Sequence, residues 1–242
     1  MVTTLYLIRH GETEGSGTKC YKGSIDVPLS ARGIEQITRA AGFLVEEIRH
    51  AAASKYIGYL KDIHGTDSQQ PAVSDTMPAD SGKALAAVYC SNLTRAVKSA
   101  EIIAAPYGLE PIVTPDLRER SFGIWEGMSF TEIKEKYPVE FEAWADNPLK
   151  YSPINGENTI GVKERVINSL KSILAAHNGE NLAIVAHGGI NRIILCHIMG
   201  IPLENIFRIE QSFASVNIIE FWEKYPVVKG LNLTPDYYGD KK

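Results

Sequence analysis

The sequence predicts an α/β protein with three layers, in which helices cover both faces of a mostly parallel central sheet. Two features of the chain predict this class. Short apolar strands alternate with amphipathic helices, and this order is typical of parallel sheets joined by helical crossovers. Residues 3–9 and 181–186 are apolar almost throughout, as strands that are buried on both faces usually are.

The first predicted strand, residues 3–9, is followed by a long helix. Ser30 is the expected N-cap, because its hydroxyl can accept a hydrogen bond from a free N–H group of the first turn. Apolar residues then recur at helical spacing and mark the face that packs on the sheet: Ile34, Ile37, Ala41 and Leu44. The helix is expected to continue past Ile48 through the alanines at 51–53.

The other elements are recognised from apolar runs and from residues that begin or end helices. In chain order they are a strand at 86–90, a helix at 92–105 closed by Pro106 and Gly108, a strand at 112–113, a helix at 129–145 broken at Pro138, a helix from Asn158 to His177, a strand at 181–186, a helix at 189–199 and a strand at 215–221. The helix after Asn158 is expected to pack through one stripe of residues: Val162, Val166, Leu170 and Leu174.

One connection is longer than the rest and predicts an insertion within a single domain of residues 1–242. Residues 49–83 join a helix to the next strand, whereas such connections usually need about 2–6 residues beyond the helix. Their centre, residues 65–80, is polar and rich in turn formers. We interpret 49–83 as an inserted helix–loop segment, for which a surface excursion, a lid and a subunit contact in a homodimer are the alternatives.

Composition and charge exclude several classes of protein. The formal net charge of −4 argues against a nucleic-acid partner, because nucleic-acid binding proteins usually have a basic face. Cys20, Cys90 and Cys196 are odd in number and widely spaced, so we expect no disulfide framework, no metal site and a cytoplasmic location. The amino terminus does not resemble a signal peptide, and no apolar run is long enough to span a bilayer, so no membrane partner is expected.

Two histidines follow predicted strands, and the first has an arginine beside it. His10 follows strand 3–9, and His187 follows strand 181–186. Carboxyl ends of parallel strands open on one crevice, where ligands bind. A neutral imidazole nitrogen can attack phosphorus, and the planar guanidinium of Arg9 can bind phosphate in a bidentate manner, through two of its oxygens. These residues predict phosphoryl transfer through a histidine.

Three further residues fit the same chemistry. Arg95 lies in the first turn of a predicted helix, where free N–H groups and the helix dipole favour anions. His187 is expected to donate a hydrogen bond to the phosphoryl group during transfer. Glu119 is the candidate acid that protonates the leaving alcohol. On composition alone, other glutamates compete for that role: Glu12, Glu14 and Glu126.

Five short blocks of residues stand in a fixed order along the chain. They are Arg9-His10-Gly11-Glu12-Thr13, Gly23-Ser24-Ile25-Asp26-Val27-Pro28-Leu29, Ser91-x-Leu93-x-Arg95-Ala96, Leu117-Arg118-Glu119 with Phe122-Gly123-x-Trp125-Glu126-Gly127, and Ala186-His187-Gly188-Gly189. This set resembles the histidine phosphatase superfamily, also called the phosphoglycerate mutase-like family. The resemblance covers nearly all of the chain except the insertion, and it implies a phosphoglycerate mutase-like fold.

The resemblance also implies a site and a reaction that needs no cofactor and no metal. His10 would be the phosphohistidine nucleophile, Glu119 the proton donor, and Arg9, Arg95 and His187 the phosphate pocket. The expected substrate-binding residues are Arg9, Thr13, Ser16, Lys22, Gly23, Arg95, His187 and Gly188. The chain departs from the family at Gly15-Ser16, where many relatives have an aromatic residue and an asparagine; Ser16 can still donate one hydrogen bond, and Lys22 adds a cation.

The leading hypothesis is a metal-independent phosphomonoesterase that acts on a small phosphorylated metabolite. Mutases of this family use additional basic residues to hold the carboxylate of phosphoglycerate, whereas residues 127–145 contain only Lys134 and Lys136 as basic residues. Two of the blocks also resemble α-ribazole phosphatases of cobalamin synthesis. The alternatives are a phosphoglycerate mutase and a catalytically silent module that binds a phosphorylated ligand.

Overall fold

A mixed sheet lies at the centre of the protein. The computed structural model describes residues 2–18, 20–53 and 84–235. Within them the strands are β1 (Thr3–Arg9), β2 (Leu85–Cys90), β3 (Ile112–Val113), β4 (Asn181–Ala186), β5 (Val216–Phe221) and β6 (Pro226–Leu233). Their order in the sheet is β3-β2-β4-β1-β5-β6, and the first four are parallel, while β5 and β6 are antiparallel to their neighbours.

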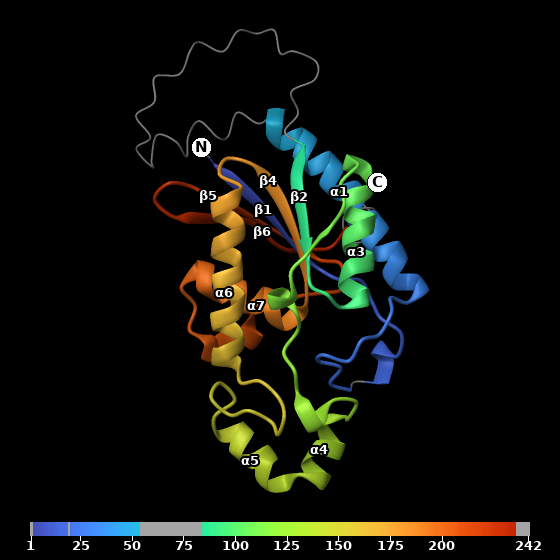
Figure 1. Cartoon of the computed structure of the whole chain (residues 1–242), viewed down its shortest axis with the longest axis vertical. Helices are drawn as coiled ribbons and strands as arrows, with labels where there is room; N and C mark the ends of the chain where they lie inside the picture. The colour runs from blue at the N-terminus through green and yellow to red at the C-terminus, as the bar shows by residue number, and fades with distance from the viewer. Residues whose placement is uncertain (1, 19, 54–83, 236–242) are drawn as a thin grey trace.

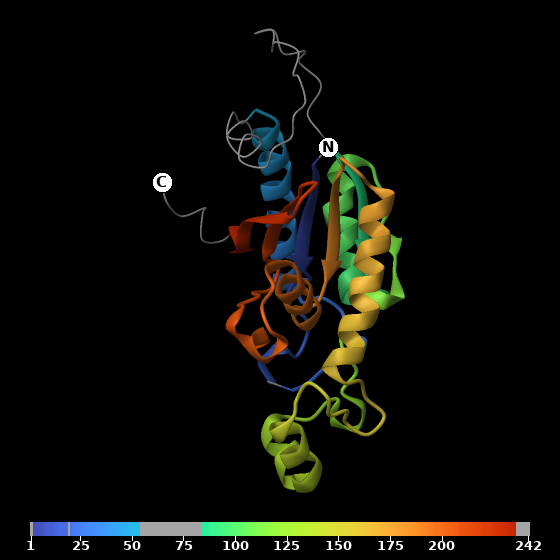
Figure 2. The same ribbon diagram turned by 90° about the vertical axis from the view of Figure 1, so that its left-hand side faces the viewer.

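Helices cover both faces of this sheet, so the predicted three-layer α/β class is confirmed. The helices are α1 (Ala31–Ala53), α3 (Thr94–Ala104), α4 (Phe130–Lys136), α5 (Pro138–Asp146), α6 (Thr159–Ala176) and α7 (Gly188–Met199). Helices α1 and α3 pack on one face, and α6 and α7 pack on the other (Figures 1 and 2). Short 3₁₀ helices join some of these elements, among them η4 (Gly123–Trp125) and η5 (Leu203–Arg208).

Side chains that alternate along the strands form a separate hydrophobic core on each face. In β4, where all 6 residues are buried, Leu182 and Ile184 pack towards α6 and α7, while Ala183 and Val185 pack towards α1 and α3. This alternation follows from the two-residue period of a strand. Burial of both faces explains why β4 is apolar at every position after Asn181.

Helix α1 begins as predicted, but one residue of its expected core face is exposed. The Oγ of Ser30 accepts a hydrogen bond from the N–H of Gly33 at 3.0 Å, which is the predicted cap. Ile34 is 42% exposed, so its assignment to the buried face was wrong. At this end of α1 the close contact is made by Gly33 instead, where an added Cβ would lie 2.0 Å from the carbonyl oxygen of Glu12. The face is buried at the other predicted positions: Ile37, Ala41 and Leu44.

The last strand, β6, was not predicted. It begins with Pro226 and contains Lys229 and Gly230, and none of its residues is buried. Proline and glycine weaken the pattern by which a strand is recognised, and they are tolerated at the edge of a sheet.

The stripe of α6 is buried at three of its four predicted positions, while Leu174 is only half-buried.

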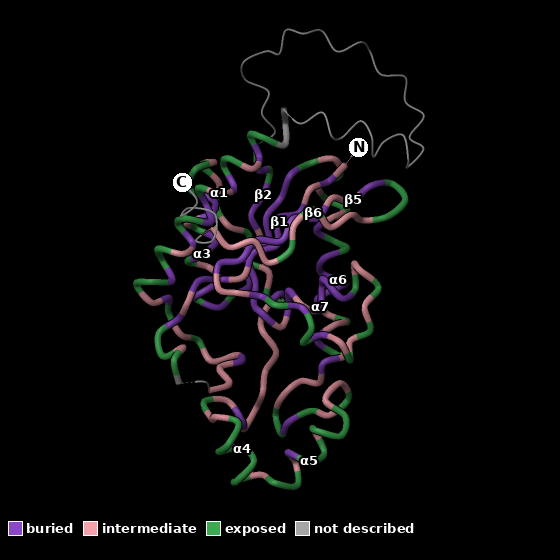
Figure 3. The backbone as a smooth tube through the Cα atoms, turned by 180° about the vertical axis from the view of Figure 1, so that it is seen from behind, coloured by how far each residue is buried: buried purple, intermediate pink, exposed green. Residues whose placement is uncertain are grey.

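Helices α4 and α5 form a small cap beyond the carboxyl ends of the parallel strands (Figure 1). The predicted break falls at Pro138, which is the first residue of α5. Many residues of the cap are exposed (Figure 3), and its core is a separate cluster around Trp125, Ile133 and Phe141. The cap therefore places aromatic residues on the side of the sheet where the parallel strands end, which is where a ligand would bind.

Part of the predicted insertion lies outside the described residues. Helix α1 includes residues 49–53, and residues 54–83 are not described, so the inserted segment and the single-domain assignment stay predictions. Among the helices that the structure describes, none is both long and apolar enough to cross a bilayer.

Candidate active site

The register of β1 and β4 brings two histidines to the same edge of the sheet. Arg9 is paired with Ala186, so His10 and His187 leave the sheet as neighbours. The backbone N–H of His10 donates to the carbonyl of Ala186 at 3.0 Å, and the two ring centroids lie 5.1 Å apart. The parallel arrangement of the two strands thus places side by side the two histidines that the sequence singled out.

His10 is buried as a neutral ring with a free lone pair. Its Nδ1 lies 2.7 Å from the carbonyl oxygen of Gly11. A carbonyl only accepts hydrogen bonds, so Nδ1 carries the proton and Nε2 keeps its lone pair. Burial, and after it the positive charges of Arg9 and Arg95, lowers the pKa of His10 well below 6.5. This is the protonation state that a nucleophile requires.

His187 is fully buried and has one unsatisfied ring nitrogen. Its Nε2 lies 2.7 Å from the hydroxyl of Ser91, while Nδ1 has no hydrogen-bond partner among the described residues. Burial, followed by the neighbouring His10, Arg95 and Arg9, lowers the pKa of His187 well below 6.5. A buried polar atom without a partner, next to the free nitrogen of His10, is one that a bound ligand can satisfy.

Arg9 lies between these histidines and the loop that precedes β5. Its NH1 donates to the carbonyl of Gln211 at 2.5 Å, and its guanidinium carbon lies 3.9 Å from the centroid of the Phe213 ring. Burial, partly opposed by the charge of Glu119, lowers the pKa of Arg9 to about 10, so the side chain is still a cation at neutral pH. Its Nε is buried and unpaired within the described part of the chain.

The same loop also holds the backbone of His10. The N–H of Ala214 donates to the carbonyl of His10 at 3.1 Å, and Ala214 has a φ of 55°. Residues other than glycine rarely adopt this left-handed conformation, and they do so mainly at functional sites. The loop therefore keeps the end of β1 in one position.

Arg95 is 3% exposed and fixes the loop after β1 through two backbone carbonyls. Its NH1 donates to Ile25 at 2.7 Å and its NH2 donates to Gly23 at 2.8 Å. Gly23 has a φ of 48°, and a Cβ there would lie 2.5 Å from Oε1 of Glu126. The predicted Gly23 thus contributes a backbone contact to Arg95, and only glycine fits there without strain.

Thr13, Ser16 and Lys22 form a hydrogen-bonded group in this loop. The hydroxyl of Ser16 donates to the carbonyl of Thr13 at 2.7 Å and lies 2.9 Å from its Oγ1. The Nζ of Lys22 donates to Oγ1 of Thr13 at 3.0 Å and to the carbonyl of Glu14. Burial, and after it the charge of Arg95, lowers the pKa of Lys22. These three predicted residues contact one another, and Lys22 is close enough to Arg95 for their charges to interact.

Glu119 is held from both sides by backbone N–H groups. Its Oε2 accepts a hydrogen bond from Gly189 and its Oε1 accepts one from Arg120, both at 3.0 Å. A Cβ on Gly189 would lie 2.6 Å from Oε1. Gly189 belongs to the first turn of α7, directly after His187, so Glu119 lies beside the two histidines. The competing Glu126 accepts hydrogen bonds from Ser24 and from the backbone of Phe122 instead.

Gly188, the last of the predicted substrate-binding residues, lies against two arginines. A Cβ there would lie 3.3 Å from Nε of Arg9 and 3.4 Å from NH1 of Arg192. Sequence reasoning missed the contributions of Ser91, Phe213 and Gln211. Ser91 stands in a recognised block, which was the available signal, whereas nothing in the local sequence marks Phe213 or Gln211.

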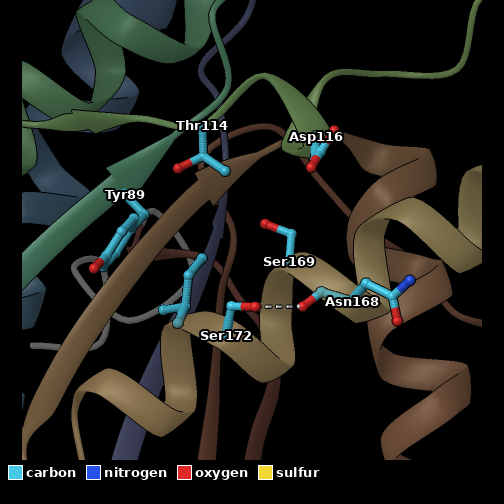
Figure 4. A pocket seen from close by; sticks show the side chains of 7 residues that line it. Tyr89, Thr114, Asp116, Asn168, Ser169 and Ser172 are labelled. Atoms are coloured by element: carbon cyan, nitrogen blue, oxygen red, sulfur yellow. Dashed lines mark hydrogen bonds between the residues drawn. The ribbon is translucent and has the colours of Figure 1, made fainter.

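Of two cavities formed by the described residues, one adjoins these side chains and the other does not. A cavity of about 300 Å³ has Glu119 and Gly189 in its lining. Another, of about 420 Å³, lies between β2 and α6 (Figure 4) and includes none of the predicted site residues in its lining: Tyr89, Thr114, Asp116, Asn168, Ser169, Ser172 and Ile173. In the described ranges, no three His, Cys, Asp or Glu side chains are grouped closely enough to hold a metal ion.

An α/β sheet with two buried histidines, the buried Arg95 and the half-buried Arg9 at its strand ends defines a class of phosphate-handling enzyme. The sequence model of the histidine phosphatase superfamily (branch 1) matches residues 5–57 and 77–234, and the chain belongs to this superfamily. The resemblance inferred from the five blocks is confirmed.

Individual relatives are similar over nearly their whole length. Phosphoserine phosphatase 1 of Hydrogenobacter thermophilus is 28% identical over 95% of this chain and 92% of its own. The adenosylcobalamin/alpha-ribazole phosphatase of Escherichia coli is 26% identical over 94% and 95%. Among solved structures, YhfR of Bacillus stearothermophilus is 28% identical over 94% and 95%, with a TM-score of 0.70. The alpha-ribazole phosphatase of Shigella flexneri has the same fold, with a TM-score of 0.73 at 24% identity over 95% and 96%.

The two buried neutral histidines lead to a prediction about pH. In the unfolded chain a histidine has a pKa of about 6.5, whereas His10 and His187 have folded pKa values well below it. Below about pH 6.5 the unfolded state binds more protons, so the free energy of unfolding should fall as the pH falls towards the folded pKa values. NMR titration of both rings measures their folded pKa values. Urea unfolding at about pH 8 and about pH 5.5 measures the change in the free energy of unfolding.

The loss of stability between these pH values should be smaller in the double variant His10→Gln, His187→Gln, since neither replacement titrates. A ring of His10 or His187 that titrates at 6.5 or above would contradict the prediction.

Proposed function

We propose that this protein is a phosphomonoesterase that hydrolyses a small phosphorylated metabolite through a phosphohistidine on His10. The observation that carries the proposal is a neutral, buried His10 whose Nδ1 donates to Gly11, which leaves Nε2 with a lone pair, and which is close enough to Arg9 and Arg95 to feel both charges. Phosphatases among the similar proteins support the same reaction.

In the first step, Nε2 of His10 attacks phosphorus. The N–P bond forms as the ester P–O bond breaks, and Glu119 delivers a proton to the leaving alcohol oxygen. Arg9, Arg95 and the Nδ1–H of His187 stabilise the charge that develops on the phosphoryl oxygens. The amino terminus of α7, which follows His187, adds N–H groups and a favourable dipole.

In the second step, water replaces the alcohol. Glu119, now a carboxylate, accepts a proton from the water, whose oxygen attacks phosphorus. The N–P bond breaks, inorganic phosphate leaves, and His10 regains its lone pair. Because the same carboxyl group gives a proton and then takes one back, the cycle returns the enzyme to its starting state.

The experiment that tests the proposal is capture of the phosphoenzyme. The protein is mixed with 4-nitrophenyl phosphate in EDTA, quenched in alkali and analysed by mass spectrometry after proteolysis. A phosphoryl group on His10, accompanied by continuous release of phosphate, is the expected result. Phosphate release without modification of His10, or a stable phosphoenzyme with no turnover, would contradict the proposal.

We expect Ser91→Ala to impair catalysis by changing the tautomer of His187. If the hydroxyl of Ser91 donates to Nε2 of His187, the ring proton is held on Nδ1, where it can serve the phosphoryl group. Loss of this donor should lower kcat by about tenfold to a hundredfold. The ¹⁵N shifts of the His187 ring report the tautomer directly, and they should change in Ser91→Ala.

Ser215→Ala is the matched control, because Ser215 is also fully buried and its hydroxyl has no partner within the described residues. It should leave both the ¹⁵N shifts and kcat near their wild-type values. A wild-type His187 ring already protonated on Nε2 would rule out this role for Ser91.

A homodimer and a cytoplasmic location are further parts of the proposal. Strand β3 forms one edge of the described sheet and exposes Ile112 and Val113, by 46% and 49%. An exposed apolar edge strand is a surface on which a second copy can pair. Light scattering over a range of protein concentrations measures the oligomeric state, and a monomer at all concentrations would exclude the dimer.

A further inference from the structure

The cavity of about 300 Å³ beside Glu119 lies where the alcohol part of the substrate would bind. It contains Glu119 and Gly189 in its lining, so the oxygen that Glu119 protonates lies next to it. Most of its walls are apolar, and four aromatic residues come from segments far apart in the chain: Tyr21, Phe122, Trp144 and Phe207. A flat ring between such walls is stabilised by the apolar surface that it removes from water.

One of the two arginines in the cavity lining, Arg120, is held in place by three hydrogen bonds within the protein. Arg120 donates from Nε to the carbonyl of Glu157 at 2.7 Å, from NH1 to Oγ1 of Thr159 at 2.9 Å and from NH2 to the carbonyl of Tyr151 at 3.2 Å. Each nitrogen of its guanidinium thus has an acceptor. These three contacts hold the guanidinium against the cap, so a substrate carboxylate would have to share the charge of Arg120 with the acceptors that it already has.

The other charged residues of the lining also disfavour a carboxylate. Glu204 is exposed on the wall formed by η5 and would repel one. Arg192 donates from Nε to the carbonyl of Ile209 at 2.7 Å, and its NH1 lies near Gly188, where Arg9 is also found. NH1 of Arg192 therefore lies at the end of the cavity that is next to Gly188 and Arg9.

We infer that the cavity selects phosphomonoesters whose alcohol part is uncharged and carries a flat ring, and that it disfavours alcohols with a carboxylate. The inference rests on the proposed function, because it assumes that Glu119 protonates the alcohol. A ring gains contact with the aromatic walls, whereas a carboxylate would lose its hydration against largely apolar walls and close to the carboxylate of Glu204.

Two primary alkyl phosphates test this selection: 2-phenylethyl phosphate and O-phosphoserine. The wild-type kcat/KM should be at least about tenfold higher for 2-phenylethyl phosphate. Phe207→Ala should lower the value for 2-phenylethyl phosphate by about three- to tenfold and that for O-phosphoserine by less than about twofold. Phe207 is 77% exposed, so its loss should not affect folding; Val139→Ala on α5, at 74% exposed, is the matched control and should change neither value.

A charge reversal at Glu204 on the cavity wall provides an independent test of the selection. Glu204→Lys should raise kcat/KM for O-phosphoserine and narrow the gap between the two substrates. A wild-type preference for O-phosphoserine, or an equal effect of Phe207→Ala on both substrates, would overturn the inference. Capture of phospho-His10 from 4-nitrophenyl phosphate distinguishes the two failures: if it still forms, only the selection is wrong, and if no substrate phosphorylates His10, the proposed function fails as well.

Discussion

Replacement of His10 by alanine is expected to lower kcat by about 10⁴-fold or more, the largest effect of any single substitution in this protein. The variant removes the nitrogen that is proposed to form the bond to phosphorus. Phosphate release from 4-nitrophenyl phosphate, measured in EDTA over acidic to neutral pH, gives the rate.

The matched control for this variant is His50→Ala, whose side chain is 73% exposed on α1 and should be replaceable without effect. Circular dichroism of both variants shows whether the fold is retained. A folded His10→Ala protein that keeps more than about a tenth of wild-type kcat would exclude His10 as the nucleophile. Activity on phosphoglycerate without phosphate release would point to the mutase instead.

Glu119→Gln is expected to have the second largest effect, and the size of that effect should depend on the leaving group. A glutamine cannot protonate the departing oxygen, so kcat/KM for an alkyl phosphate should fall by about 10²- to 10⁴-fold. An activated aryl phosphate leaves without that proton, and its first step should be much less affected. Equal losses on both substrates would count against Glu119 as the acid.

Gly189→Ala should also lower kcat/KM more for an alkyl phosphate than for an activated aryl phosphate, although the carboxyl group of Glu119 is still present. The added Cβ would lie 2.6 Å from Oε1 of Glu119, so the side chain of Glu119 must move. Because the far end of a flexible side chain can shift, the fold should tolerate the change while the proton donor is misplaced. Gly42→Ala on α1, where an added Cβ meets nothing within 4 Å, is the control.

Much of the fold could be predicted because its elements have strong local signals. Strands β1 and β4 are apolar almost throughout since both their faces are buried, and the caps of α1 and α6 are the expected Ser30 and Asn158. Strand β6 could not be predicted, because an edge strand is half-exposed and tolerates proline and glycine. Ile34 was assigned by spacing alone, and spacing does not reveal that Gly33 makes the contact at that end of α1.

The sequence by itself determined the residue types at the strand ends and the five ordered blocks, and these were enough to identify the superfamily. Only the tertiary structure decided how the side chains meet. Arg9 bonds to Gln211 across 202 residues of chain, and Ser91 meets His187 across 96. Such contacts depend on how the sheet orders its strands and how loops fold back over their ends, which no local pattern encodes. The same holds for the cavity beside Glu119, whose walls come from segments far apart in the chain and exist only once these segments are packed together.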